Sequence, residues 1–138
     1  MKYLTTHYIF MQENENNIIS LETVIEVLDS KMILVNLIGK IIDQTTSQAL
    51  VNEITELLSA DKNLVIINLE KVEYINSNGL NSLISILTKT RTRGGEVVLC
   101  NINEKVEKLL LITKLNSVFN IEDSIENAKQ KLTTFNQN

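Results

Sequence analysis

Hydrophobic and polar residues follow two different periods along this chain. Between residues 19 and 27, apolar and polar side chains alternate, which is typical of a half-buried strand. Residues 32–38 are almost continuously apolar, which indicates a central strand covered on both faces. Asp29-Ser30-Lys31 between them predicts a turn, so the two strands form a hairpin. Gly39 is expected to break the second strand.

Helical spacing takes over after residue 43. Leu50, Ile54, Leu57 and Leu58 share one helix face, and Asp43 or Thr46 is placed to cap that helix. Short apolar runs at 64–69 and 96–100 predict two further buried strands. Between these two runs, Leu80, Leu83, Ile84 and Leu87 recur at helical spacing and predict another helix, which ends at Gly94-Gly95.

The C-terminal third continues the alternation. Asn103 is a suitable cap for a helix with Val106, Leu109 and Leu110 on its inner face. A weak edge strand is expected at Val118-Phe119. Asp123 or Ser124 then caps a last helix, whose inner face is formed by Ile125, Ala128 and Leu132.

The order of elements is therefore β-β-α-β-α-β-α-(β)-α. Strands joined by helices run parallel, with right-handed crossovers. The fold class is α/β: a single domain with a mostly parallel mixed β-sheet, an N-terminal hairpin and about four packed helices. We assign residues 18–134 to this domain, residues 1–17 to an extension that adds a strand or an arm, and residues 135–138 to a polar tail. The polar stretch that leads into this tail begins at Thr133. The extension is expected to cover a sheet edge or to make a homodimer contact.

Charge and composition narrow the classes of function. The formal net charge of -4 disfavours nucleic-acid binding, which requires a basic surface. Lys89, Arg91 and Arg93 form the only basic cluster, and they either complement a helix dipole or contact an acidic partner. One cysteine, Cys100, and one histidine, His7, disfavour a disulfide, a metal site and a Cys/His dyad.

The chain also lacks signals for membranes and for phosphate chemistry. No apolar run approaches the ~20 residues that cross a bilayer, and the N-terminus does not have the pattern of a signal peptide. We therefore expect a cytoplasmic protein with no direct membrane insertion. The sequence has no GxxxxGK[ST] loop and no GxGxxG. It is predicted to be a non-enzymatic protein without a cofactor or metal.

The segment Asn76-Ser77-Asn78-Gly79 separates the strand at 64–69, and a polar connector after it, from the following helix. Three short hydrogen-bonding side chains occupy a helix start where one cap would be sufficient. They serve either as simple capping or as a docking site for an anion or a partner. The inner face of the helix is predicted to carry Leu80, Leu83, Ile84 and Leu87. The outer face is predicted to carry Asn81, Ser82, Ser85, Thr88 and Lys89.

These segments together resemble a STAS domain, the fold of anti-sigma factor antagonists. The family pattern has Asp-Ser-Ser-Gly-Leu at the start of a helix, and this chain has Asn76-Ser77-Asn78-Gly79-Leu80. Gly94-Gly95 and the strand at 96–99 follow in the family order. The similarity continues through Leu110, Thr113, Leu115, Phe119 and Ile121, and it covers about residues 23–132.

The resemblance implies a partner: an anti-sigma factor that is also a serine kinase. In the family, this kinase phosphorylates the second serine of the motif, which ends the binding. That serine falls on Asn78, which has no hydroxyl and is neutral like the unphosphorylated state. Binding is therefore expected to be constitutive, or controlled elsewhere, with Ser77 as the main alternative phosphosite and Ser82 as another. The predicted partner-binding residues are Asn76, Ser77, Asn78, Gly79, Asn81, Ser82 and Ser85.

Two alternatives remain at this point. STAS-like subunits also accompany ABC transporters that move phospholipids, and a missing phosphoserine suits such a constitutive role. Nucleotide binding or hydrolysis at the same helix start is disfavoured, because the sequence supplies no lysine for phosphate and no evident base.

Overall fold

The N-terminal part of the chain folds as two consecutive hairpins. The computed structural model describes residues 7–14 and 16–135. Strands β1 (His7–Glu13), β2 (Ile19–Val27) and β3 (Met32–Ile41) pair antiparallel in that order. The hairpin predicted at 19–38 is confirmed, and the described part of the N-terminal extension is a strand. Residues 1–6 lie outside the described residues.

The rest of the chain adds parallel strands with helices between them. The elements are α1 (Gln44–Leu57), β4 (Leu64–Ile75), α2 (Ser77–Thr92), β5 (Glu96–Cys100), α3 (Glu104–Ile112), the 3-10 helix η1 (Leu115–Ser117), β6 (Asn120–Glu122) and α4 (Ile125–Phe135). Strands β3 to β6 are mutually parallel, and the six strands lie in the sheet in chain order. The predicted fold class is confirmed.

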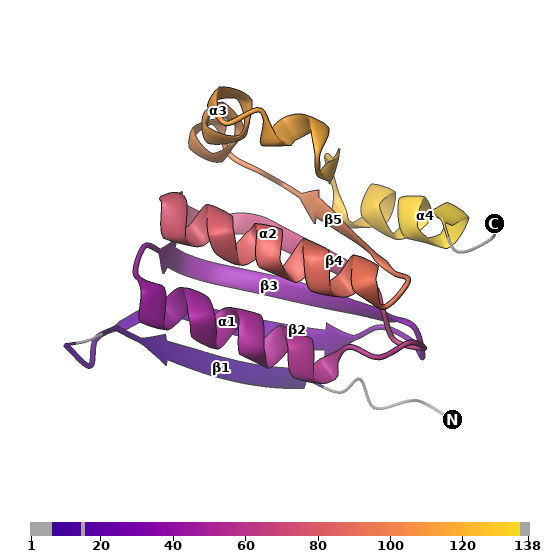
Figure 1. Ribbon diagram of the computed structural model, residues 1–138, viewed down its shortest axis with the longest axis horizontal. Coiled ribbons are helices and arrows are strands. Elements are labelled where there is room, and N and C mark those ends of the chain that lie inside the picture. The colour runs from indigo at the N-terminus through magenta and orange to yellow at the C-terminus, as the bar shows by residue number, and fades with distance from the viewer. Residues whose placement is uncertain (1–6, 15, 136–138) are drawn as a thin grey trace.

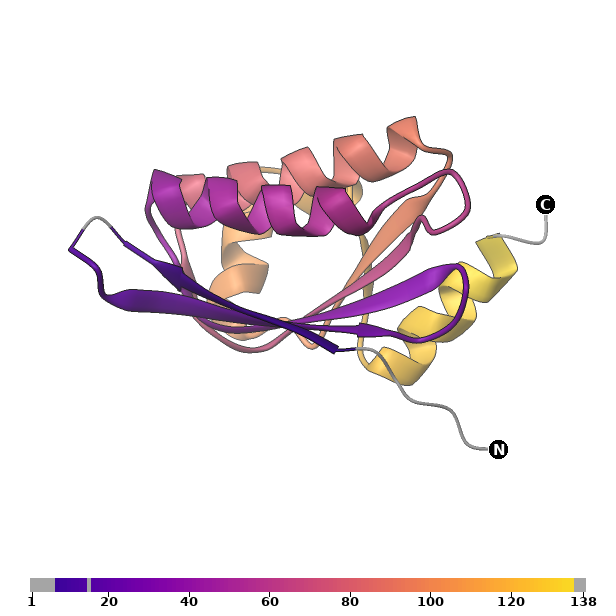
Figure 2. The ribbon, with the colours of Figure 1, turned by 90° about the horizontal axis from the view of Figure 1, so that it is seen from below.

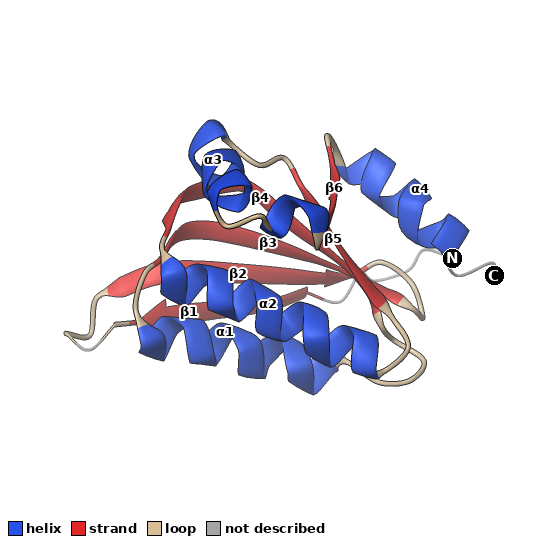
Figure 3. Ribbon diagram, turned by 45° about the horizontal axis from the view of Figure 1, so that its top comes forward, coloured by secondary structure: helices blue, strands red, loops and turns tan. Residues whose placement is uncertain are grey.

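Helices cover the two faces of the sheet unequally. Helices α1 and α2 lie side by side on one face, and α4 lies on the other (Figures 2 and 3). Val106 and Leu110 of α3 join the core beneath α1 and α2. A second, smaller core forms where α4 packs Ala128 and Leu132 against β3, β4 and β5. Each face is built almost entirely from aliphatic side chains, as expected for a chain with few aromatic residues.

Gly39 does not end β3, contrary to the prediction. The strand continues to Ile41, and Gly39 adopts a positive φ of 121° within it. A Cβ atom at this position would lie 2.4 Å from the carbonyl oxygen of Ser20 on β2. Glycine is therefore required by the close approach of the neighbouring strand as well as by its backbone angle.

Three other boundaries differ from the prediction. The expected connector after residue 69 is part of β4, which continues to Ile75. The last short strand is β6 at Asn120–Glu122, while Phe119 before it is buried in the core. Helix α4 includes Thr133 and continues to Phe135, so the polar residues after Leu132 begin as helix.

Candidate functional site

Three helices begin at one end of the molecule. Parallel strands β3, β4 and β5 end there, and α1, α2 and α3 start just beyond them, on the left of Figure 1. The turn between β1 and β2 lies at the same end (Figure 1). In open α/β sheets, ligands bind outside the carboxyl ends of the strands. The predicted site residues lie at this end because β4 leads directly into α2.

Asn76 is the N-cap of α2. Its Oδ1 accepts hydrogen bonds from the backbone N–H of Asn78 at 2.9 Å and of Gly79 at 3.4 Å. Its Nδ2 donates to the carbonyl oxygen of Ile42 at 2.9 Å. One amide group thus satisfies the helix start and joins it to the segment between β3 and α1.

Asn78, two residues after Asn76, also joins the helix start to the segment between β3 and α1. Its Nδ2 donates to the carbonyl oxygen of Ile42 at 3.1 Å. Gly79 permits this close approach, because a Cβ there would lie 2.6 Å from the carbonyl oxygen of Ile41 and 2.8 Å from the Cβ of Ile75. The start of α2 is therefore held tightly against the end of β3, and the side chains of Asn76 and Asn78 remain half-buried.

A polar groove of about 410 Å³ runs between α1 and α2 from this point. Every described residue that lines it is uncharged: Gln44, Ser47, Gln48 and Val51 of α1, and Asn78, Asn81, Ser82 and Ser85 of α2. The sequence prediction missed the contribution of α1. Its signal was present in the sequence, since Gln44, Ser47 and Gln48 follow the i, i+3, i+4 spacing of one helix face.

Ser82 does not lie on an exposed face, contrary to the prediction. It is only 3% exposed, and its hydroxyl donates to the carbonyl oxygen of Gly79 at 2.6 Å. The inward stripe also differs, because Ile86 is fully buried while Ile84 is only partly buried. The buried face of α2 is thus turned toward α1 relative to the predicted face. The small side chain of Ser82 lets the two helices approach. Asn81 is exposed and Ser85 half-buried, so both remain accessible.

Ser77 faces away from that groove, toward α3. It is exposed and lines a separate hollow of about 340 Å³. The charged residues of this hollow are Lys105 and Lys108, and its apolar walls include Tyr74 and Ile112. Sequence analysis did not connect α3 with Ser77, because the two are brought together only by the parallel order of β4 and β5.

Exposed apolar side chains gather around the start of α2. Tyr74 is 48% exposed and Ile112 is 77% exposed on the α3 side. Ile42, between β3 and α1, is 37% exposed, and Ile18 and Ile19 at the β1–β2 turn are more than half exposed. Exposed apolar residues gathered beside polar ones are typical of a protein contact surface.

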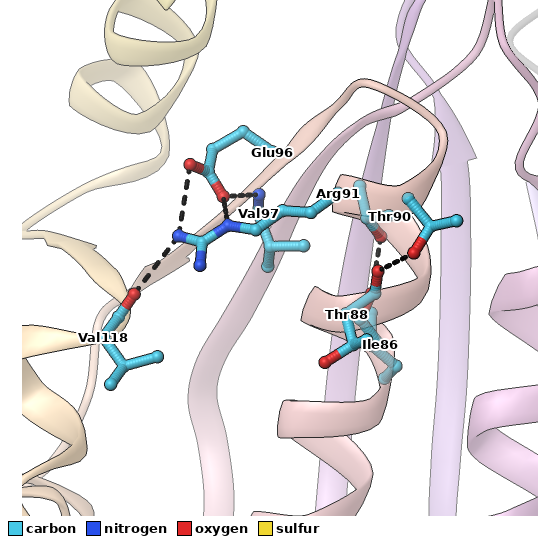
Figure 4. Close-up of polar contacts among 8 residues, drawn as sticks. Ile86, Thr88, Thr90, Arg91, Glu96, Val97 and Val118 are labelled. Carbon is cyan, nitrogen blue, oxygen red and sulfur yellow. Dashed lines mark hydrogen bonds and ion pairs between the residues drawn. The ribbon is translucent and has the colours of Figure 1, made fainter.

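The basic cluster at the far end of α2 serves the fold. The Arg91 guanidinium pairs with the Glu96 carboxylate at 2.9 Å and donates to the carbonyl oxygen of Val118 at 3.3 Å (Figure 4). Arg93 donates to the carbonyl oxygen of Lys89 in the last turn, at 2.8 Å. The Arg91 contacts tie α2 to β5 and to the segment before β6, and the Arg93 bond closes the last turn of α2. Both favour the structural interpretation of the cluster.

Other regions offer less for a functional site. A hollow of about 640 Å³ between the β5–β6 edge and α4 mixes Glu96, Glu122 and Lys131, and no predicted site residue lines it. Among residues 7–14 and 16–135, no group of three or more potential metal ligands gathers in one place. None of the helices in the described part of the chain combines the length and apolarity that a membrane crossing requires.

Comparison with known proteins places the chain in a family. The STAS domain family matches residues 23–128, so this chain is a member of the STAS family. A relative from Thermotoga maritima, named as an anti-sigma factor antagonist, is 34% identical over 77 residues, which are 56% of this chain and 68% of the relative.

Solved structures agree at the level of the fold. The anti-sigma factor antagonist from Mycobacterium paratuberculosis has a TM-score of 0.72 at 21% identity, covering 88% of this chain and 98% of that one. The unphosphorylated form of the antagonist SpoIIAA has a TM-score of 0.69 at 16% identity, covering 81% of this chain and 96% of that one. The relatives from Thermotoga maritima and Bordetella bronchiseptica are both named as anti-sigma factor antagonists.

Proposed function

We propose that this chain is an anti-sigma factor antagonist that binds an anti-sigma factor/serine kinase through the surface around Asn76, without catalysis of its own. The observation that carries the proposal is the start of α2, where uncharged side chains are surrounded by exposed apolar residues. The names of the relatives support the choice of partner. A site of this kind suits a protein surface more than a small charged substrate.

The predicted residues take different parts in this surface. Ser77, Asn81 and Ser85 are accessible and are assigned to direct contact with the partner. Asn76, Asn78 and Gly79 hold the helix start in position and present its edge. Ser82 supports the α1–α2 packing from within, and Gln44 and Gln48 extend the contact surface onto α1.

Binding is proposed to be constitutive with respect to position 78. Asn78 offers no hydroxyl, and its amide is already hydrogen-bonded to the carbonyl oxygen of Ile42. A phosphate on a serine would add about -1.5 to -2 charge at this point, whereas Asn keeps the surface neutral. Any control by phosphorylation would have to act elsewhere, with exposed Ser77 as the first alternative.

The proposal predicts the effect of a single negative charge. Asn78→Asp should weaken binding to the anti-sigma factor/serine kinase at least about tenfold, because a charged group in a neutral contact surface must be desolvated. Calorimetric titration of each purified anti-sigma factor/serine kinase of the source cell measures the affinity. Asn127→Asp on α4 is the matched control, since it makes the same change at an exposed position on the opposite face.

Three results would contradict the proposal. If no such kinase bound the wild-type chain, the proposed function would be excluded. If Asn78→Asp and Asn127→Asp bound with equal affinity, the proposed site would be excluded. Incubation of the wild type with the kinase and ATP, followed by mass spectrometry, tests constitutive binding. Stoichiometric phosphate on Ser77 would replace it with a switch at the neighbouring position.

The role of an ABC transporter accessory subunit remains the alternative hypothesis from the family resemblance. A constitutive, unphosphorylated surface at Asn78 suits it as well. Co-purification with an ATPase subunit, together with no binding to any anti-sigma factor, would favour it.

A further inference from the structure

The sheet has two edges of very different length. β6 forms one edge with three residues, and β1 forms the other with seven. In an antiparallel pair, every second residue directs its N–H and C=O away from the partner strand. β1 pairs with β2 only, and no described element lies beyond it in Figure 1. Its outer side is therefore a row of backbone donors and acceptors open to another strand.

β1 lacks the features that usually protect such an edge. Natural edge strands carry lysine, proline or a central bulge that prevents pairing with another chain. Residues 8–12 of this chain contain no charge and no proline, and the register irregularity of β1 lies at its end, between Gln12 and Glu13. The edge is thus chemically suited to pairing.

The two faces of β1 are already divided between core and solvent. Gln12 is buried and Phe10 partly buried on the side of α1. Ile9 is 61% exposed and Met11 53% exposed on the opposite side, which α4 leaves uncovered at this strand. Two isolated aliphatic side chains on an open edge would gain by packing against a matching strand.

We propose that β1 pairs antiparallel with β1 of a second copy, so that one sheet runs through a two-fold homodimer. Full overlap of the seven residues places Phe10 opposite Phe10, Ile9 opposite Met11, and Tyr8 opposite Gln12. In this register odd-numbered residues lie opposite odd-numbered ones, and even-numbered residues lie opposite even-numbered ones. Side chains on the α1 side of the sheet therefore meet one another, and side chains on the opposite side meet one another. The contact is the same on both copies, as a two-fold interface requires.

The neutral centre and the symmetric register of β1 suit a second copy as the occupant, despite the net charge of the chain. Each chain carries a net charge of -4, so most surfaces of two copies repel each other. The centre of β1 is neutral, and antiparallel pairing sends the two Glu13 residues to opposite ends of the ribbon. A seven-residue ribbon is a small interface, so the dimer should be reversible and depend on concentration.

Sedimentation velocity of the full chain tests the dimer, from about 1 μM to about 1 mM. The weight-average mass should rise from the 15.6 kDa of one chain toward twice that value. Met11→Lys should raise the dissociation constant about tenfold, and Ile9→Lys/Met11→Lys should abolish the dimer, because lysines then lie directly opposite each other. Leu111→Lys on α3 is the matched control, since Leu111 is 54% exposed against 53% for Met11.

A monomer at every concentration, or a dimer that survives the double lysine variant, would overturn the proposal. A cross-link tests the register without depending on stability. A mixture of Ile9→Cys and Met11→Cys chains should form an intermolecular disulfide, because opposite residues have Cβ atoms about 4.5–5.5 Å apart. Neither variant alone should do so, and Cys100 is fully buried and does not compete. Equal cross-linking of one variant with itself would exclude this register.

Discussion

At the scale of single residues, the amide of Asn76 combines two functions that a carboxylate cannot. Its oxygen caps α2, and its nitrogen donates to the carbonyl oxygen of Ile42. Aspartate, which the family pattern has here, accepts hydrogen bonds but does not donate when ionised. The Asn-Ser-Asn-Gly variant therefore changes more than the phosphosite, since both amides hold the β3–α1 segment against α2.

This arrangement predicts a graded loss of stability. Asn76→Ala should lower the free energy of unfolding by about 1–2 kcal/mol, because the cap and the bond to Ile42 are both lost. Asn76→Asp should cost less, because the cap remains and a negative charge is favourable at a helix N-terminus. Urea denaturation measures both, with Asn81→Ala on the exposed side of α2 as the control. An aspartate variant as unstable as the alanine variant would show that the bond to Ile42 dominates.

At the scale of elements, helices were easier to predict than the ends of strands. Asp43 and Asn103 cap α1 and α3 as expected, since a polar residue before an apolar periodic run is a local signal. The end of β4 has no such signal, because Glu70, Lys71 and Glu73 are exposed within it and resemble a loop. The burial of Ser82 depends on the approach of α1, a tertiary contact that hydrophobic periodicity cannot register. The start of α2 could be predicted from the sequence. Its contacts with α1 and α3 could not, because they depend on the order of the strands in the sheet.

The link between β1 and α1 predicts a dependence on pH. Gln12 of β1 donates to Thr23 at 2.9 Å and to the Glu53 carboxylate of α1. Burial raises the pKa of Glu53 from 4.5 to about 7, the Gln12 hydrogen bond lowers it, and Glu56 adds a smaller upward effect. Between these two pH values the folded chain keeps a proton that the unfolded chain has lost. The stabilisation from Glu53 is therefore complete below about pH 4.5 and disappears as pH rises through about 7.

Glu53→Gln should remove this dependence. The variant should match the wild type near the acid end of the range and exceed it in stability above pH 7. Thermal unfolding of both proteins across this range measures the difference. Glu107→Gln, at an exposed position on α3, serves as the control and should leave the wild-type profile unchanged. A wild-type profile in the Glu53 variant would show that another group is responsible.

At the scale of the whole molecule, the sheet separates two cores of unequal size. The smaller core contains Cys100, which is fully buried beneath α4 together with Leu132. Burial raises the pKa of the Cys100 thiol to about 11, with a smaller contribution from Glu70. The thiol is therefore protonated and inaccessible in the folded protein, so its reactivity reports the opening of α4.

Labelling of Cys100 at pH 8 should be far slower in the native protein than in urea. Leu132→Ala should accelerate native labelling strongly, because a cavity costing about 2–5 kcal/mol loosens the α4 core next to the thiol. Leu110→Ala is the matched control, since Leu110 is equally buried but belongs to the larger core. Leu110→Ala should accelerate labelling only through the increased population of the globally unfolded chain, and not through local opening of α4. Rapid labelling of the wild type without denaturant would contradict the packing of α4.

The agreement between strand order and chain order has a consequence for how the molecule is made. Each strand pairs with the one synthesised immediately before it, from β1 to β6. No strand is inserted between two that already pair, so a growing chain never has to separate a finished pair to admit a later one. The sheet can lengthen in step with translation, beginning from β1 and closing with β6.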